Sequence, residues 1–201
     1  MSSCSGAPEA KSCFATPLIL GASVSAGYGT NRGGTSEIIA KEIHPEAVIS
    51  NRAKSGATSL QSLKDLNLHT VNPSVVLALD LFFWDAARNQ CGENFISHTT
   101  KFFRSFEGTP LIVGKIPVDV SFPDGYRLAG ARPCTKVVNA LIEKLCKIEA
   151  NCLIYDPKEC LNQMSSPEDY FLDKLHPNDK GNEFCTKKFI ESGRYKSLTC
   201  A

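Results

Sequence analysis

Residues near the C-terminal end of the chain combine an acid and a histidine at a spacing that suits proton transfer. Asp173 lies three residues before His176, and Pro177, a residue favoured in the first turn of a helix, follows directly. On a bend that leads into a helix, this spacing lets the Asp173 carboxylate fold back to the imidazole ring. No acidic residue stands three positions before the remaining histidines, His44, His69 and His98. We therefore take His176 as the candidate general base and Asp173 as the group that orients it.

A base of this kind makes a serine reactive, because a serine hydroxyl is a poor nucleophile until its proton is removed. Ser23 lies in the glycine-bounded loop of residues 21–29, and Gly56 lies in a second loop, residues 51–58. The first loop matches neither G-x-x-x-x-G-K-S/T nor G-x-G-x-x-G, and the chain lacks G-x-S-x-G. Nucleotide binding and the nucleophile elbow of the α/β-hydrolases are therefore not expected.

Each of these residues also has a purely structural interpretation. Asp173 can favour the positive end of a helix dipole without touching His176. Ser23 can be a small residue in a tight turn, and Gly56 can be an ordinary glycine before a helix cap. The chemical interpretation depends on whether the fold brings the loops together.

Five short apolar runs, bounded by Gly, Pro or Asn, indicate the strands that carry these loops. They cover residues 17–20, 47–50, 75–79, 111–113 and 152–155. Short continuous apolar runs are typical of strands buried on both faces. The loops with Ser23 and Gly56 follow the first and second runs, at the carboxyl ends where parallel sheets build their sites.

Patterns of helical period separate the strands. Thr58 and Gln61 form a capping box before Leu60, Leu63, Leu66 and Leu68. Pro133 precedes apolar residues that recur every three or four positions, namely Val137, Val138, Leu141, Ile142, Leu145 and Ile148. Residues 93–106 and 178–190 are the other expected helices. The alternation predicts a parallel sheet covered on both faces, in a single domain of residues 16–201 after an N-terminal tail of residues 1–15.

Composition excludes several classes of protein. The 22 Lys and Arg against 21 Asp and Glu give a net charge of +1, so no nucleic-acid partner is expected. No apolar stretch approaches the roughly 20 residues of a membrane helix, so no transmembrane segment is expected. The nine cysteines contain no C-x-x-C pair, which excludes zinc ribbons and thioredoxin motifs. Their number favours disulfides and an extracytoplasmic, periplasmic or secreted, location.

Three blocks together resemble the SGNH, or GDSL-type, hydrolase family. They are the segment from Gly21 to Ser25, the loop with Ser55 and Gly56, and the Asp173-x-x-His176-Pro177 sequence. The similarity extends from about Thr16 to Ile190. It implies a three-layer α/β/α sandwich with a five-stranded parallel sheet, flavodoxin-like in layout, and it implies no cofactor or metal.

The resemblance also implies roles for individual residues. Ser23 would be the nucleophile, His176 the general base and then acid, and Asp173 its orienting carboxylate. The backbone N–H groups of Ser23 and Gly56 would face the oxyanion. The family's third oxyanion donor is an Asn in a Gly-x-Asn-Asp block after strand three, where this chain has Asp80-Leu81-Phe82-Phe83-Trp84-Asp85. Ala22 also replaces the Asp of the family's Gly-Asp-Ser opening.

Trp84 is the candidate replacement for the missing Asn, because its indole N–H is a pure hydrogen-bond donor and a short insertion aligns it there. An ungapped alignment places Phe82 there, and packing in an apolar wall is an equal alternative for Trp84. Asp80 and Asp85 would repel an oxyanion, and we expect them to point towards an arginine such as Arg52 or Arg88. Tyr28 and Phe82 are expected to contact the substrate.

The implied activity is hydrolysis of a small-molecule, glycan or lipid carboxylic ester through an acyl-enzyme. Two alternatives remain open. An O-acyltransferase would use the same residues with a second hydroxyl in place of water. A catalytically weak carbohydrate- or lipid-binding protein on the same scaffold would explain the lost Asn and the aromatic cluster of Phe82, Phe83 and Trp84.

Overall fold

Five parallel strands form the centre of the computed structural model, which describes residues 12–64, 72–149 and 151–200. The strand order is β2-β1-β3-β4-β5. The strands are β1 (Pro17–Ile19), β2 (Ser50–Asn51), β3 (Val75–Ala78), β4 (Leu111–Gly114) and β5 (Cys152–Tyr155). The order reverses between β1 and β3, and such switch points are where open parallel sheets bind ligands. The loop with Ser23 follows β1, and the segment that leads to Trp84 follows β3.

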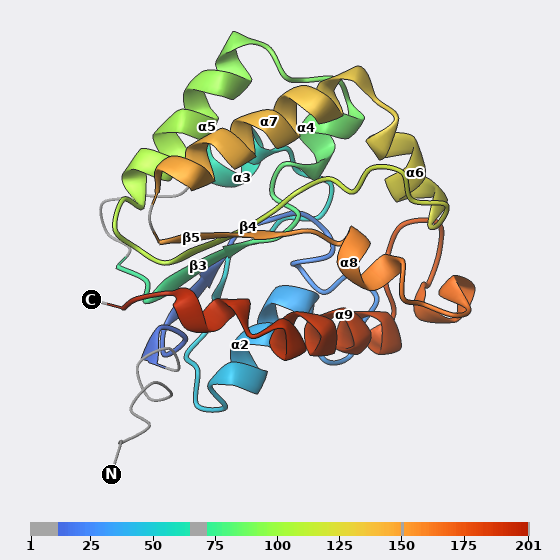
Figure 1. Cartoon of the computed structure of the whole chain (residues 1–201), viewed down its shortest axis with the longest axis horizontal. Helices are drawn as coiled ribbons and strands as arrows, with labels where there is room; N and C mark the ends of the chain where they lie inside the picture. The colour runs from blue at the N-terminus through green and yellow to red at the C-terminus, as the bar shows by residue number, and fades with distance from the viewer. Residues whose placement is uncertain (1–11, 65–71, 150, 201) are drawn as a thin grey trace.

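Helices cover both faces of the sheet (Figure 1). One layer contains α3 (Ser59–Lys64), α4 (Phe83–Ala87), α5 (Glu93–Ser105) and α7 (Pro133–Ile148), and the other contains α2 (Thr35–Ile43) and α9 (Asp179–Ser192). Shorter elements are α6 (Asp124–Gly130), α8 (Lys158–Leu161), η1 (Pro167–Tyr170) and η2 (Arg194–Ser197). The predicted three-layer α/β/α sandwich is therefore confirmed.

Alternation along the strands divides the core into two parts. Leu18 and Val76 pack in the cluster that includes α5 and α7, whereas Ile19 and Leu77 pack in the cluster that includes α2 and α9. All four are fully buried. Successive side chains of a strand point to opposite faces, so each apolar run supplies both layers, which explains the uninterrupted runs in the sequence.

The helix predictions are confirmed for α5, α7 and α9, and α7 begins at Pro133 as expected. The capping box is present, since Thr58 N donates to Gln61 Oε1 at 2.9 Å. The predicted leucine face of α3 is only partly confirmed. Leu63 packs against the core, but Ser59 and Ser62 are the buried residues of the helix and Leu60 is 51% exposed. Two of its expected members, Leu66 and Leu68, lie outside the described residues.

Two features differ from the expected boundaries. The second strand starts at Ser50 rather than at residue 47, and Val48 is 73% exposed. β2 is an edge strand, with only β1 as a neighbour, and it does not need the buried run that a central strand needs. Helix α2 was not predicted, because a β-branched segment that follows Gly33 and Gly34 gives a weak helix signal.

Four disulfides are present among the described residues, as the cysteine count predicted. They are Cys13–Cys200, Cys91–Cys134, Cys146–Cys152 and Cys160–Cys185. Cys4 lies outside the described residues. Cys13 and Phe14 are fully buried in the α2–α9 cluster, so the packed core includes residues before Thr16.

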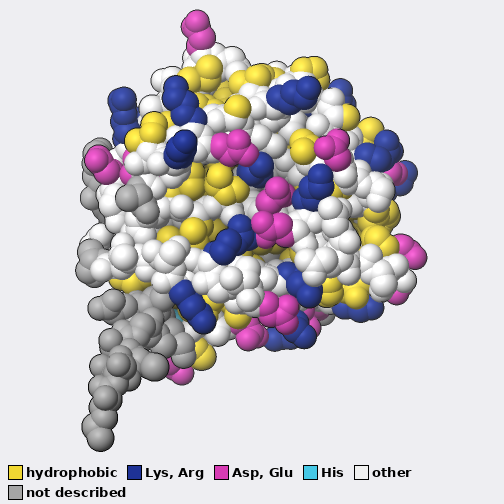
Figure 2. Space-filling model, viewed as in Figure 1, with side chains coloured by type: hydrophobic (Ala, Val, Ile, Leu, Met, Phe, Trp, Pro, Cys, Tyr) yellow, Lys and Arg dark blue, Asp and Glu magenta, His cyan; other side chains and the backbone are white. Residues whose placement is uncertain are grey.

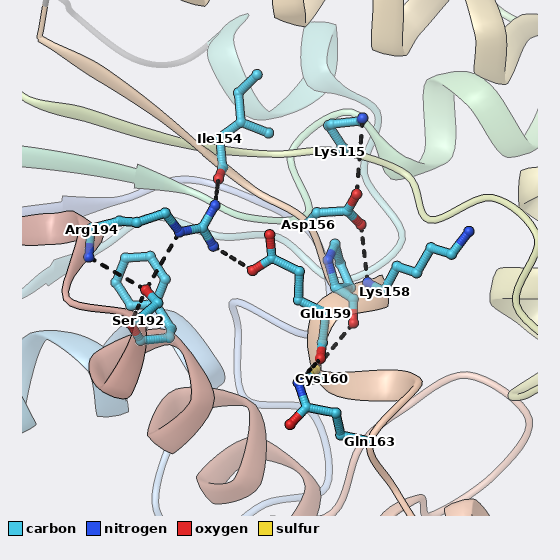
Figure 3. Close-up of polar contacts among 11 residues, drawn as sticks. Lys115, Ile154, Asp156, Lys158, Glu159, Cys160, Gln163, Ser192 and Arg194 are labelled. Carbon is cyan, nitrogen blue, oxygen red and sulfur yellow. Dashed lines mark hydrogen bonds and ion pairs between the residues drawn. The ribbon is translucent and has the colours of Figure 1, made fainter.

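A polar network covers the outer edge of β5 (Figure 3). The Arg194 guanidinium donates to Ile154 O at 3.3 Å and pairs with Glu159. Lys115, which follows β4, pairs with Glu143 at 2.6 Å and lies 3.9 Å from Asp156. Arg194 thus donates a hydrogen bond to a backbone carbonyl of the edge strand β5, and this carbonyl is then not available to pair with another strand.

Positive and negative side chains are interspersed on the face shown in Figure 2. Within residues 12–64, 72–149 and 151–200, no helix is long and apolar enough to cross a membrane.

Candidate active site

The structure brings Ser23, His176 and Asp173 into one hydrogen-bonded line. The distance from Ser23 Oγ to His176 Nε2 is 2.9 Å, and His176 Nδ1 lies 2.8 Å from Asp173 Oδ2. A carboxylate only accepts, so Nδ1 carries a proton and the neutral ring leaves Nε2 free to accept from the serine hydroxyl. This arrangement can remove the proton of Ser23.

The short loop before α9 holds the histidine and the aspartate. Asp173 Oδ1 accepts the backbone N–H groups of Leu175 at 2.7 Å and His176 at 2.8 Å, an Asx-type turn that folds the acid back onto the ring. Leu172 N donates to His176 O at 2.8 Å and closes the base of the loop. Helix α9 then begins after the N-cap Asn178, whose side chain accepts from Gly181 N.

Hydrogen bonds keep the Asp173 carboxyl ionised. Partial burial alone would raise the pKa of this carboxyl, but the backbone and ring N–H groups of His176 and the N–H of Leu175 lower it below its ordinary value. A carboxylate that stays charged stabilises the imidazolium that forms when His176 takes the serine proton. The Asp173 side chain is 48% exposed, whereas that of His176 is 17% exposed.

Tyr28 lies over the histidine. Its ring centroid is 4.5 Å from that of His176, the two planes are tilted by 40°, and Tyr28 is 53% exposed. The ring is exposed beside the base, and its contact with a substrate stays a prediction. Phe82 cannot make such a contact, because its side chain is fully buried against Phe95 and Phe102. The expected substrate contact of Phe82 was therefore wrong.

The two predicted backbone donors are the N–H groups of Ser23 and Gly56. Among the described residues, nothing accepts a hydrogen bond from the N–H of Ser23 or from that of Gly56. Gly56 has φ +71°, a conformation that favours glycine. Its loop is tied to the nucleophile loop, since Lys54 N donates to Gly21 O at 2.9 Å and Asn51 Nδ2 donates to Ser25 O at 3.0 Å.

Trp84 is linked to the Gly56 loop through Arg88. The Arg88 guanidinium lies 4.7 Å from the centroid of the Trp84 ring and donates to Gly56 O at 3.0 Å. The indole Nε1 is buried and has no hydrogen-bond partner in the structure of the described residues. An unpartnered buried donor is unusual in a folded protein.

The two aspartates of this segment do not point to arginines, and that expectation was wrong. Asp80 accepts the backbone N–H groups of Ala22, Val24 and Ser25 in the nucleophile loop. Asp85 accepts the N–H of Ser59 at 2.8 Å, at the start of α3. Neither forms an ion pair with Arg52 or Arg88 within the described ranges. The sequence does not show which backbone N–H groups of a loop lack partners, and the hydrogen bonds of Asp80 to this loop were therefore not predicted.

Nothing in this part of the structure is arranged as a metal centre. Across the described residues, no group of three or more His, Cys, Asp or Glu side chains could hold a metal ion.

No protein-family model matches the sequence, and no curated protein matches it significantly. Solved structures do match. The esterase EstA from Pseudoalteromonas sp., described as inhibited by monoethylphosphonate, is 21% identical with a TM-score of 0.64, over 90% of this chain and 97% of that one. A putative GDSL-like lipase from Parabacteroides merdae is 14% identical with a TM-score of 0.66, over 90% and 95%.

A third match is the acetylxylan esterase Axe2 from Geobacillus stearothermophilus. It is 15% identical with a TM-score of 0.63, over 96% of this chain and 97% of that one. Its match, like the other two, spans nearly the whole of both chains. The chain therefore has the α/β/α fold of the GDSL, or SGNH, hydrolases.

Proposed function

We propose that the protein is a serine carboxylic ester hydrolase, with Ser23 as nucleophile, His176 as general base and Asp173 as its orienting group. The observation that carries the proposal is the continuous Ser23–His176–Asp173 hydrogen-bond line, with distances of 2.9 and 2.8 Å. The fold and the esterases and lipases that share it add support. No metal or cofactor takes part in the proposed reaction.

The reaction proceeds in two halves. Ser23 Oγ attacks the ester carbonyl carbon while its proton passes to His176 Nε2. The tetrahedral intermediate then collapses, the C–O bond to the alcohol breaks, and the alcohol leaves with the proton from Nε2. Water attacks the acyl-enzyme in the same way, with its proton taken by His176, and Ser23 leaves as the free hydroxyl with the acid product.

The oxyanion is held by the N–H groups of Ser23 and Gly56, for which the described residues offer no acceptor, and by the Trp84 indole N–H. Trp84 has two supports for this role. Its N–H has no partner among the described residues, and the Arg88 contact ties its ring to the Gly56 loop. Because the indole nitrogen is buried, neighbouring side chains must move for it to meet the oxyanion, whereas backbone donors that are fixed before the reaction stabilise the developing charge without reorganisation.

The leaving alcohol lies on the side of His176, because this residue returns the proton to it. The exposed ring of Tyr28 covers that side. We therefore assign Tyr28 to contact with the alcohol part of the substrate. The aromatic cluster gives no matching support for a binding protein, since Phe82 and Phe83 are buried.

The four disulfides favour folding in an oxidising compartment. We propose an extracytoplasmic location on this ground. Counting alkylatable thiols by mass spectrometry, in protein made in its native compartment, tests it. Nine free thiols would contradict the location.

A fluorophosphonate probe tests the function without a guess at the natural substrate, because it reacts only with an activated serine. We expect the wild type to be labelled at Ser23 and to hydrolyse small activated esters. Ser23→Ala should lose both properties while its circular dichroism spectrum stays unchanged. Wild-type turnover in Ser23→Ala would exclude Ser23 as the nucleophile.

A further inference from the structure

We infer that Asp80 is a positioning residue that holds the Ser23 loop in the conformation that oxyanion binding requires. This inference rests on the proposed role of Ser23. Asp80 stands two residues beyond the end of β3, and its partners lie in the loop that follows β1. It contacts no reacting atom, and it acts through the backbone of its neighbours.

The carboxylate takes the N–H groups on both sides of Ser23 and leaves that of Ser23 itself. Oδ1 accepts from Ala22 N at 3.0 Å, and Oδ2 accepts from Val24 N at 2.9 Å and from Ser25 N at 3.3 Å. None of the described residues accepts from Ser23 N. Because the flanking peptides are fixed, the direction of the Ser23 N–H is fixed before a substrate binds.

Gly21 provides the space that the carboxylate occupies. A Cβ atom on Gly21 would lie 2.2 Å from Asp80 Oδ1 and 2.6 Å from Ser25 Oγ. Such distances are far below van der Waals contact, so any side chain at position 21 would displace the carboxylate or the loop. Gly21 and Asp80 therefore depend on each other.

Strand pairing explains how a residue after β3 reaches the loop after β1. Ile19 pairs with Leu77 in the parallel register, and Ala22 and Asp80 each lie three residues further along. The two positions are thus level at the carboxyl edge of the sheet. Asp80 therefore reaches the N–H groups on both sides of Ser23 from the neighbouring strand.

The Asp80 carboxyl is held by hydrogen bonds from three backbone N–H groups and from the Ser25 hydroxyl. No lysine or arginine pairs with it among the residues that the structure describes. Asp80→Asn keeps the size of the side chain but replaces one accepting oxygen by a donating NH2 group. Whichever way the amide turns, this group faces either the N–H of Ala22 or those of Val24 and Ser25, and the loop must shift.

The test compares Asp80→Asn with Asp85→Asn, a matched control. Asp85 is a buried carboxylate on the same segment, but it binds the N–H of Ser59 instead of the nucleophile loop. The readouts are kcat and KM for a p-nitrophenyl ester and the inhibition constant of an alkylboronic acid. Boron adds to the serine Oγ as a tetrahedral adduct with an oxygen in the oxyanion site.

We expect Asp80→Asn to lower kcat at least tenfold, with KM within about twofold and a boronate inhibition constant raised by the same factor as kcat falls. A mutation that removes one oxyanion donor outright costs about 10² to 10³ in kcat. Asp85→Asn should stay within threefold in all three values. A role in stability alone would lower the active fraction but leave the inhibition constant of the remaining molecules unchanged, and this result would overturn the inference.

Two further measurements keep the outcome clear. If Asp80→Asn fails to fold, Gly21→Ala displaces the same carboxylate without changing a charge, and it must show the same joint change in kcat and boronate inhibition. Fluorophosphonate labelling of the wild type separates the two proposals. An unlabelled wild type refutes the proposed function, whereas a labelled wild type together with an unaffected Asp80→Asn refutes only the role of Asp80.

Discussion

Replacing Trp84 by Phe separates a role in oxyanion binding from a role in packing. The substitution keeps one aromatic ring and removes the indole N–H. If this N–H is the third oxyanion donor, kcat for a small ester should fall by about 10² to 10³, equal to roughly 3 to 4 kcal/mol in the transition state, with little change in KM.

The structure predicts a much smaller change in the free energy of unfolding. Removing a buried donor that has no partner relieves a cost of about 1–3 kcal/mol. Loss of ring area, on the order of 40 Å² at about 25 cal/mol per Å², costs about 1 kcal/mol. The weakened contact with Arg88, whose guanidinium is 4.7 Å from the ring centroid, costs about 0.5–1 kcal/mol more. These contributions nearly cancel.

Steady-state kinetics and urea unfolding of the same preparation decide between the roles. Phe83→Leu is the packing control, since Phe83 is buried, lies edge-on to Trp84 at 5.3 Å between centroids, and has no N–H. It should lose stability and keep kcat. A Trp84→Phe protein with wild-type kcat would refute the donor role and leave the two backbone N–H groups as the whole oxyanion site.

Asp173→Asn should lower kcat by up to about 10⁴ in steady-state assays, because an amide favours the wrong imidazole tautomer; a loss below about tenfold would contradict its role. The hydrogen bonds of Asp173 lower its pKa. Its contribution to the free energy of unfolding should therefore be present above pH 3.8 and disappear as the pH falls through the lowered pKa. Unfolding of the wild type and of Asp173→Asn at several pH values measures this contribution. Burial raises the pKa of Asp80, against hydrogen bonds from Ser25, Ala22 and Val24. Its contribution should therefore be fully present below pH 3.8 and decline as the pH rises through the raised value, and an unfolding free-energy difference between wild type and Asp80→Asn that grows with pH would contradict this. Replacing Cys13 and Cys200 by Ala should lower the free energy of unfolding by about 5 kcal/mol in the chain-entropy approximation, against about 2 kcal/mol for Cys146 and Cys152. The reason is that the first disulfide joins residues 187 apart and the second joins residues 6 apart. Equal losses in urea unfolding would refute that account.

The sheet could be predicted because buried parallel strands leave a local signal. The runs at β1, β3 and β4 are buried at every position, because both layers pack on these central strands. The edge strand β5 is also apolar, although it is only partly buried. The Asp173–His176 pair was equally local, since one turn of chain contains both groups. Ser23 was found by its place after a strand. That position tells at which end of the sheet the residue lies, but it does not tell which side chains the residue contacts.

The errors concern directions that depend on tertiary packing. Helix α4 begins at Phe83 and turns Phe82 inward against α5, and no local pattern specifies which ring of an aromatic run turns inward. The partners of Asp80 lie 55 to 58 residues earlier in the chain. The strand register that brings Asp80 beside these partners is a property of the folded sheet and not of the local sequence.

The disulfide between Cys13 and Cys200 joins two residues that are 187 positions apart, and it turns the chain between them into a covalent ring. A single proteolytic cut inside this ring leaves both pieces attached, so nicked protein would keep its mass until reduced. The ring also brings the two ends of the domain together, which is the geometry that circular permutation needs. A permutant could open at Gly108, an exposed turn before β4, because the amino ends of the strands lie opposite the edge that carries Ser23.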